Sequence, residues 1–267
     1  MARIGLVAGE GKLPIAFAKV AKAKGDTVIA FGLRGVTDEK LADHVAKMHW
    51  LDWGALQKGL LLLAMERIRH IVMLGKLKKE LFFKDAASMD DETKSMLQKM
   101  GDKKDYALMN KAAAILSKVG VEVMDSTAYL RDLIPAKGVL TKRAPTEAEE
   151  RDIDYGQSVA KALSGFDIGQ TLIVKEKTVI AVEAMEGTDE VIQRAGRLVQ
   201  GGFVAVKVAR PDQDMRFDVP LVGIGTLKAI VEAGGSVVAL EADKTLLMDR
   251  DEVIRLADER NIAIVVI

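Results

Sequence analysis

The sequence predicts an α/β protein with two domains. Apolar runs of strand length alternate with helical patterns along the chain, an arrangement typical of a parallel sheet covered by helices. A segment without clear periodicity, residues 134–145, interrupts this alternation and carries two of the five prolines, with Gly138 between them. We therefore predict a first domain over residues 1–135 and a second over 136–267, each of ordinary domain size.

The first domain opens with a strand, a glycine turn and a helix. The run IGLVAG predicts the strand, and GEGKLP predicts the turn, because Gly9 and Gly11 allow a tight backbone and Pro14 suits the first turn of a helix. Free N–H groups at such a helix start can hold a phosphate. The motif lacks the third glycine of the dinucleotide fingerprint, so a plain strand-to-helix turn is an equal alternative. With the strands that follow, this opening predicts a Rossmann-like parallel sheet.

Four more strands and four helices complete the first domain. The strands are expected at 27–32, 49–51, 70–76 and 121–124, and the helices at 55–68, 93–100, 106–118 and 128–133. The third of these strands ends at Gly75 and Lys76, and Lys78, Lys79 and Lys84 follow. Ligands of open α/β sheets bind beyond the carboxyl ends of strands, so this basic cluster is a candidate ligand site. A solvated lysine-rich face is the alternative.

The second domain combines a hairpin with alternating strands and helices, which predicts a mixed sheet. A charged helix at 146–163 begins at Thr146, whose hydroxyl suits a helix cap. Two β runs then flank residues 175–177, as expected of a hairpin. The remaining elements are a strand at 203–208, a helix at 227–233, a strand at 237–240, a helix at 252–259 and a strand at 262–267.

Composition excludes several classes of site and favours an anionic substrate. The chain has no cysteine, which excludes disulfides and thiolate metal sites, and its three histidines lack the HxxxH spacing of zinc sites. A net charge of zero and an aromatic content of 4% argue against a nucleic-acid partner. Residues 1–135 hold 22 Lys plus Arg against 17 Asp plus Glu, whereas residues 136–267 hold 17 against 22. A basic half beside an acidic half suits an anionic substrate bound with a metal ion.

Neither a secretory leader nor a membrane span is visible in the sequence. The strand-like IGLVAG follows Met1, Ala2 and Arg3 directly. The most apolar helical stretch, residues 60–65, is far too short to cross a bilayer. We therefore expect a cytoplasmic protein.

Acidic side chains gather at two corners within residues 181–220. Glu183, Glu186 and Asp189 lie before a predicted helix, and Asp212, Asp214 and Asp218 follow the next apolar run. Magnesium prefers carboxylate and water oxygens and usually binds through one or two carboxylates plus substrate phosphates. The cations Lys207, Arg210 and Arg216 lie among these acids and could pair with phosphate oxygens. The stretch therefore predicts Mg²⁺-dependent phosphoryl chemistry rather than hydride transfer.

The same stretch also has ordinary structural interpretations. Acids in loops are commonly just solvated, and Asp189, Glu190, Arg194 and Arg197 have the spacing of ion pairs along one helix face. Thr188 or Asp189 could equally cap the helix that follows.

Six segments spread along the chain carry a resemblance to a known family. They are IGLVAGEGKLP, MLGK, DIGQTLIV, AVEAMEGTD, RAGRLVQGG and QDMRFDVP. Together they resemble the LpxI family, the UDP-2,3-diacylglucosamine pyrophosphatases of lipid A biosynthesis in Gram-negative bacteria. The resemblance implies Mg²⁺-dependent hydrolysis of the substrate diphosphate to 2,3-diacylglucosamine 1-phosphate (lipid X) and UMP, by attack of water on the sugar-side phosphorus.

The resemblance also implies a domain arrangement and partners. It implies two α/β domains, the C-terminal one catalytic, with the substrate cleft between them. A substrate with two acyl chains implies transient contact with the inner-membrane surface, by a monomer or a homodimer.

The resemblance further assigns roles to residues. The essential acid is expected in QDMRFDVP as Asp214 or Asp218, with Lys207 and Arg216 neutralising phosphate oxygens. The expected metal ligands or their close partners are Asp214, Asp218, Glu183, Glu186 and Asp189. The expected nucleotide or phosphate contacts are Gly9, Glu10, Gly11, Lys76 and Thr188. One departure concerns residues 221–226, which read LVGIGT where relatives read roughly TIGPxT; Gly225 loosens that helix start and leaves the role of Thr226 open.

Two other functions stay open at this point. A nucleotide-binding oxidoreductase would need an acidic residue at the end of the second strand to bind a ribose, whereas that strand ends in Phe31, Gly32, Leu33 and Arg34. A non-catalytic module that binds nucleotide-sugars or lipids is the other alternative, and it predicts that Asp218→Ala leaves ligand binding intact.

Overall fold

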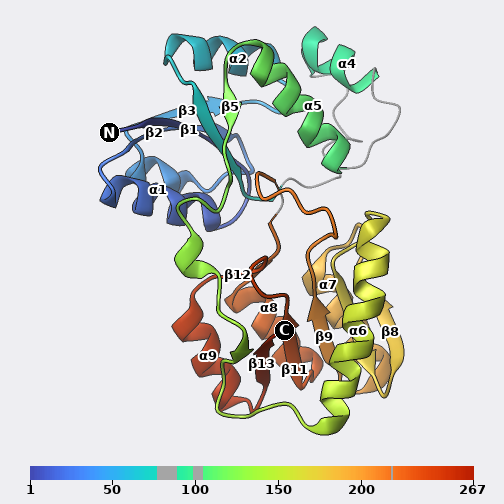
Figure 1. Cartoon of the computed structure of the whole chain (residues 1–267). Helices are drawn as coiled ribbons and strands as arrows, with labels where there is room; N and C mark the ends of the chain where they lie inside the picture. The colour runs from blue at the N-terminus through green and yellow to red at the C-terminus, as the bar shows by residue number, and fades with distance from the viewer. Residues whose placement is uncertain (77–88, 99–104, 218) are drawn as a thin grey trace. The chain divides into compact units, whose positions relative to one another are not determined.

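The computed structural model describes residues 1–76, 89–98, 105–217 and 219–267 (Figure 1). The chain forms two compact units. The first unit comprises Met1–Leu130 together with Asp214–Asp218, and the second comprises Arg131–Gln213 together with Val219–Ile267. The chain therefore leaves the first unit after Leu130 and returns to it for the five residues Asp214–Asp218.

The first unit is built on a five-stranded parallel sheet in the order β3-β2-β1-β4-β5. The strands are β1 (Arg3–Ala8), β2 (Thr27–Leu33), β3 (Lys47–Leu51), β4 (His70–Leu74) and β5 (Glu122–Val123). This is the strand order of a Rossmann fold, in which the direction of winding reverses between β1 and β4. The predicted Rossmann-like sheet is confirmed.

Helices cover both faces of this sheet (Figure 1). The helices of this unit are α1 (Leu13–Ala23), η1 (Glu39–His44), α2 (Leu56–Met65), α4 (Asp91–Gln98) and α5 (Asp105–Lys118). Leu63 of α2 and Ala113 of α5 pack on one face of the sheet, and α1 lies on the other. The predicted helix at 55–68 ends at Met65, because Arg67 turns into the left-handed region with a φ of 52°.

The second unit contains a six-stranded mixed sheet in the order β6-β13-β11-β9-β7-β8. The strands are β6 (Gly138–Val139), β7 (Thr171–Lys175), β8 (Thr178–Val182), β9 (Val204–Lys207), β11 (Val237–Leu240) and β13 (Ala263–Val266). Strands β9, β11 and β13 are parallel, whereas β6 and the β7–β8 hairpin add antiparallel neighbours. The predicted mixed sheet is confirmed.

Helix α6 (Glu147–Gly165) packs on one face of this sheet and three helices pack on the other. Those three are α7 (Thr188–Val199), α8 (Ile224–Ala233) and α9 (Arg250–Glu259). Thr146 caps α6 in a reciprocal capping box with Glu149, as predicted for this helix start. The short elements η2 (Arg131–Leu133), β10 (Leu221–Val222) and β12 (Leu246–Leu247) complete the unit, and β10 pairs with β12. Within the described ranges, no helix is both long and apolar enough to cross a membrane.

Candidate functional site

Four residues from different elements of the second unit meet at one edge of its sheet. Lys207 ends β9 and pairs in register with Thr171 at the start of β7. Glu183 follows the last residue of β8, and its backbone N–H donates to the carbonyl of Thr171 at 2.9 Å. Thr188 begins α7. Because β8 and β9 both end here, this is the edge at which ligands bind in α/β sheets.

The side chains of these residues form one connected polar cluster. Lys207 Nζ donates to Thr188 Oγ1 at 2.7 Å and to Thr171 Oγ1 at 3.2 Å. Thr188 Oγ1 donates in turn to Glu183 Oε1 at 2.8 Å, and the N–H of Gln170 donates to Glu183 Oε2 at 3.3 Å. Lys207 is only 8% exposed. A lysine buried to this degree requires polar partners, which the two threonines and Glu183 provide.

The electrostatics of the cluster keep Glu183 ionised. Burial acts to raise the pKa of Glu183, but the charge of Lys207 and hydrogen bonds from Thr171, Thr188 and Gln170 outweigh it and lower the pKa. An ammonium group has three hydrogens to donate. Two of those of Lys207 go to the threonines, and no third acceptor lies within hydrogen-bonding distance among the described residues. One donor therefore remains for an anionic ligand.

The other two acids of this corner do not join the cluster. Glu186 accepts from Arg194 at 2.6 Å, and Asp189 accepts from the hydroxyl of Thr226 at 3.0 Å. In the part of the chain that the structure describes, no three His, Asp or Glu side chains converge as a metal-ligand set. The prediction that Thr188 or Asp189 caps α7 is wrong, because Gly187 takes the cap position and no side chain caps this helix.

In the first unit, the turns after β1 and β4 touch backbone to backbone. Gly9 N–H donates to the Leu74 carbonyl at 2.8 Å, and Glu10 and Lys76 exchange two backbone hydrogen bonds at 2.9 and 3.0 Å. A Cβ at Gly9 would lie 2.7 Å from the Lys76 carbonyl oxygen. A Cβ at Gly75, whose φ is 97°, would lie 2.7 Å from the Gly9 carbonyl carbon. Glycine is thus required for the two turns to meet at the point where the strand order reverses.

This contact decides which part of the glycine turn a phosphate can reach. The N–H groups of Gly9, Glu10 and Lys76 are already paired within the protein. Gly11, with a φ of 104°, is different, because a Cβ at this position would meet no described atom within 4 Å. Of the predicted nucleotide contacts in this unit, Gly11 is therefore the most approachable.

The segment Asp214–Asp218, which carries the predicted catalytic acids and is called the acid loop below, belongs to the first unit. Phe217 is 1% exposed and belongs to the apolar cluster between the sheet and helices α2 and α5. The N–H and the hydroxyl of Ser126 both donate to the Met215 carbonyl, at 2.9 and 2.5 Å. The predicted division at residue 135 assigns this loop to the second domain, whereas the structure includes Asp214–Asp218 in the first unit.

Asp214 is held by its neighbour Arg216. Both carboxylate oxygens of Asp214 accept from the guanidinium, at 2.6 to 3.0 Å, and Oδ1 also accepts from the Arg216 N–H at 3.0 Å. Arg216 therefore lowers the pKa of Asp214 and outweighs the opposing effect of burial. The predicted site residue Asp218 lies outside the described residues, as do the lysines of the predicted basic cluster after Lys76.

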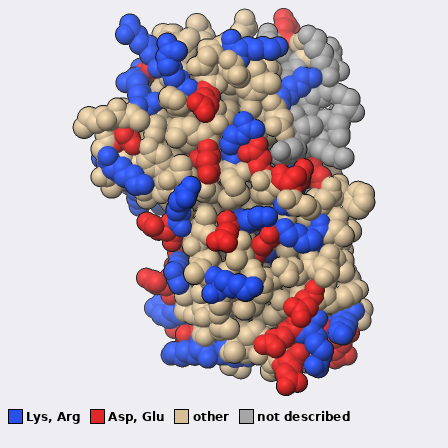
Figure 2. All heavy atoms as spheres, in the orientation of Figure 1, with Lys and Arg blue, Asp and Glu red and all other residues tan. Residues whose placement is uncertain are grey.

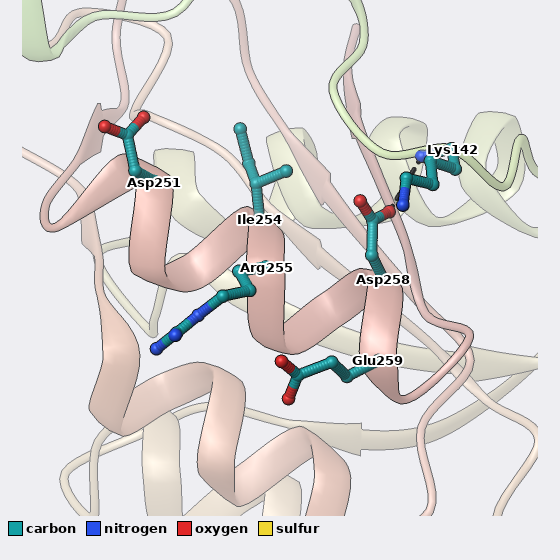
Figure 3. A pocket seen from close by; sticks show the side chains of 6 residues that line it. All are labelled: Lys142, Asp251, Ile254, Arg255, Asp258 and Glu259. Atoms are coloured by element: carbon teal, nitrogen blue, oxygen red, sulfur yellow. Dashed lines mark hydrogen bonds between the residues drawn. The ribbon is translucent and has the colours of Figure 1, made fainter.

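The surface pocket shown in Figure 3 does not involve any of these residues. It lies over α9 and is lined by Lys142, Asp251, Ile254, Arg255, Asp258 and Glu259. The Lys142 N–H donates to Asp258 at 2.8 Å across it. Basic and acidic side chains are interspersed over the face shown in Figure 2.

Two family models match the chain. The N-terminal domain of LpxI matches residues 3–133, and the C-terminal domain of LpxI matches residues 136–265. The chain belongs to the LpxI family. Among its relatives is the UDP-2,3-diacylglucosamine pyrophosphatase LpxI of Caulobacter vibrioides, which is 29% identical over 271 aligned residues. That alignment covers 97% of this chain and 95% of the relative.

Other similarities are partial or weak. The bifunctional purine biosynthesis protein PurH of Bradyrhizobium diazoefficiens is 34% identical over 140 residues, which is 48% of this chain and 24% of that protein. The biotin carboxylase domain of a thermophilic 2-oxoglutarate carboxylase matches at a TM-score of 0.27 and 10% identity, over 64% of this chain and 34% of that one. The biotin carboxylase subunit of a pyruvate carboxylase matches at a TM-score of 0.28 and 13% identity, over 75% of this chain and 42% of that one. These structural scores are too low to carry an argument.

Sequence reasoning missed Thr171, Ser126 and Phe217 as parts of the candidate sites. Thr171 lies within DIGQTLIV, and its position opposite Lys207 follows only from the register of β7 and β9. Ser126 and Phe217 are 91 residues apart in the chain, and no periodic pattern connects positions at that separation.

Proposed function

We propose that this member of the LpxI family is a UDP-2,3-diacylglucosamine pyrophosphatase that releases lipid X and UMP in lipid A biosynthesis. The observation that carries the proposal is the alignment with the Caulobacter pyrophosphatase, which extends over 97% of this chain and 95% of that protein. A relative that shares both domains at full length is a better guide to activity than one that shares a single domain.

The proposed reaction is hydrolysis of one phosphoanhydride bond. Water adds to the sugar-side phosphorus, the bond from that phosphorus to the bridging oxygen breaks, and UMP leaves with the bridging oxygen. The water protons pass to solvent or to a basic group. Charge develops on the phosphate oxygens during this step, so the residues with most to contribute are fixed cationic donors.

Lys207 is the first candidate for such a donor. Its ammonium group is buried, is held by two threonine hydroxyls, and keeps one hydrogen for a ligand. A donor that is already oriented needs no reorganisation during the reaction, which makes it more effective than a flexible surface lysine. In this proposal, Glu183 and Thr188 orient Lys207, and Glu183 need not be a metal ligand.

Asp214 and Arg216 form the second candidate group. Because its pKa is lowered, Asp214 is anionic at neutral pH, and an anionic carboxylate can accept a hydrogen bond from the attacking water. Arg216 could pair with a phosphate oxygen, as proposed from the sequence. Asp218 shares the proposed catalytic role through its place in QDMRFDVP.

A requirement for Mg²⁺ is part of the proposal through the family resemblance. The predicted ligands that the structure describes, Glu183, Glu186, Asp189 and Asp214, accept from separate partners and do not fit a preformed ligand set. A cation that enters with the diphosphate needs only one or two carboxylates, so the requirement can be tested directly by chelation.

The substrate also implies where the protein works. Two acyl chains keep UDP-2,3-diacylglucosamine at a membrane surface, so we propose a cytoplasmic protein that makes transient contact with the inner membrane. Flotation with liposomes that contain the substrate tests this contact. Absence from the floating fraction, with and without substrate, would count against it.

The activity itself is tested by UMP release from UDP-2,3-diacylglucosamine with Mg²⁺ or with EDTA. We expect release by the wild type with Mg²⁺, loss of release with EDTA, and loss in Asp214→Ala with the fold retained. Asp251→Ala, an exposed acid on α9, is the matched control and should behave as the wild type. A wild type that binds the substrate but releases no UMP under any metal would support the non-catalytic binding module instead.

A further inference from the structure

The acid loop is attached to the first unit by an aromatic anchor. Phe217 is almost fully buried, in a cluster that contains Phe31 of β2, Ile71 of β4 and Ala113 of α5. A phenylalanine buried to this extent makes a large contribution to a core. The apolar core of the first unit is therefore completed by a residue that lies 87 positions after Leu130, the last residue of the main segment of that unit.

A second attachment holds the backbone of the loop. Ser126 is 1% exposed, and both its N–H and its hydroxyl donate to the Met215 carbonyl. The loop closes on itself between these two attachments, because the Phe217 N–H donates to the Asp214 carbonyl at 3.0 Å. Asp214 thus lies one residue before the carbonyl held by Ser126 and three residues before the buried ring.

We propose that Phe217 and Ser126 are positioning residues that set where the Asp214 carboxylate lies during the proposed hydrolysis. The inference rests on the proposed function, because it gives these two residues a role in that reaction. Neither residue touches the reacting atoms in this account; both act through the backbone of the loop. Displacement of a catalytic group by about 1 Å can cost about 100-fold in rate, so loss of an anchor affects the chemical step as well as stability.

Kinetics of UMP release by folded variants tests the proposal. Phe217→Ala should lower kcat by about 10- to 100-fold with a much smaller change in KM, at a temperature where circular dichroism shows the variant to be folded. Phe217→Leu keeps an apolar anchor and should recover most of kcat. Ser126→Ala removes the hydroxyl but keeps the N–H bond to Met215, so its loss should be smaller than that of Phe217→Ala.

Phe203 provides the matched control, because it is also fully buried but belongs to the core of the second unit. Phe203→Ala, or Phe203→Leu if the alanine variant does not fold, should keep the wild-type kcat per folded molecule. Equal losses of kcat in the Phe203 and Phe217 variants, or a wild-type kcat in Phe217→Ala, would overturn the positioning role.

Limited trypsin digestion separates this inference from the proposed activity. In the wild type, the bond between Arg216 and Phe217 should resist cleavage, because the ring on its far side is buried; in Phe217→Ala it should be cut quickly. Rapid cleavage of the wild type at this bond would overturn the anchor, whatever the enzyme does. If the wild type resists trypsin but releases no UMP, the burial of Phe217 is supported. The proposed function and the positioning role are then both refuted.

Discussion

The hydroxyl group of Thr188 connects Lys207 to Glu183 by hydrogen bonds of 2.7 and 2.8 Å. The hydroxyl has one hydrogen, which it gives to the carboxylate, so it can only accept from the ammonium. The two hydrogen bonds therefore run in one direction, from the Lys207 ammonium to the Thr188 hydroxyl and from that hydroxyl to the Glu183 carboxylate. Within the second unit, this arrangement joins three residues that the sequence analysis selected for separate reasons.

The Thr188 hydroxyl is expected to matter for turnover more than the bulk of its side chain. Thr188→Val keeps the shape but breaks both hydrogen bonds, each of which involves a charged group and contributes about 1.5–3 kcal/mol. If half of the summed contribution of the two bonds is expressed in the transition state, kcat falls by about 10- to 100-fold, whereas Thr188→Ser should stay close to the wild type. Steady-state UMP release compares the three proteins. Equal rates for the valine and serine variants would show that the connection has no catalytic role.

Removal of the Glu183 charge should destabilise the fold, because it leaves Lys207 buried without a counter-ion. Glu183→Gln is expected to lower the free energy of unfolding by about 2 kcal/mol, between the values for exposed and fully buried pairs. Glu186→Gln breaks the exposed pair with Arg194 and should cost less than about 1 kcal/mol. Urea titration measures both. The double variant Glu183→Gln with Lys207→Met should recover part of the lost free energy of unfolding. If the effects of the two single substitutions simply add in the double variant, Glu183 and Lys207 are not coupled.

A different ion cluster governs the acid sensitivity of the first unit. Lys47 and His49 donate to Glu66, and with Arg3 they lower its pKa to about 2 despite the opposing effect of desolvation. A folded-state pKa below the unfolded value means that the stabilisation is complete above pH about 4.5 and is lost as the pH falls toward about 2. The free energy of unfolding should therefore fall less steeply over this range in Glu66→Gln than in the wild type. Glu39→Gln serves as the exposed control, and equal slopes in all three proteins would contradict the prediction.

The contact between the turns after β1 and β4 should make Gly75 intolerant of substitution. Gly75→Ala places a Cβ 2.7 Å from the Gly9 backbone in addition to the cost of its positive φ. Gly25 also has a positive φ, 82°, but a Cβ there meets no described atom within 4 Å, so Gly25→Ala should cost only about 1–2 kcal/mol. Thermal unfolding should show a clearly lower Tm for Gly75→Ala than for Gly25→Ala. Matching values would mean that the two turns can separate without cost.

Local patterns were sufficient to predict the strands of four or more residues, because each carries an apolar run bounded by turn residues. The strands β6, β10 and β12 were missed, since two residues are too few to show a period, whereas the equally short β5 lies within the predicted four-residue run 121–124. The hairpin at residues 175–177 was predicted, but its support was not: the N–H groups of Glu176 and Lys177 both donate to the carboxylate of buried Asp152 on α6. Contacts of this kind depend on packing between elements and leave no local trace in the sequence.

The candidate sites also combine residues that local sequence could predict with contacts that only packing determines. Residue chemistry singled out Lys207 and Glu183, and the family resemblance added Thr188. The register of β7, β8 and β9 places Lys207, Thr171 and the residue that follows β8 at one edge of the sheet. The prediction grouped Glu186 and Asp189 with Glu183 because they are close in sequence. In the structure, Glu186, which precedes α7, accepts from Arg194, and Asp189, in the first turn of α7, accepts from Thr226. The packing of Phe217 into the first unit depends on a long-range chain return that no periodicity could reveal.

The central claim, that this chain is a pyrophosphatase in which Lys207 stabilises the reacting phosphate, is tested most directly by one comparison. UMP release from UDP-2,3-diacylglucosamine is measured for the wild type, Lys207→Met and Lys175→Met. Lys175 lies at the opposite end of β7, where it donates to the carbonyls of Val199 and Gly201, and so controls for loss of a lysine from the same sheet. We expect kcat to fall by about 100- to 1,000-fold in Lys207→Met and to stay close to wild type in Lys175→Met. A wild type that releases no UMP, or a Lys207→Met variant that keeps the wild-type kcat, would contradict the claim.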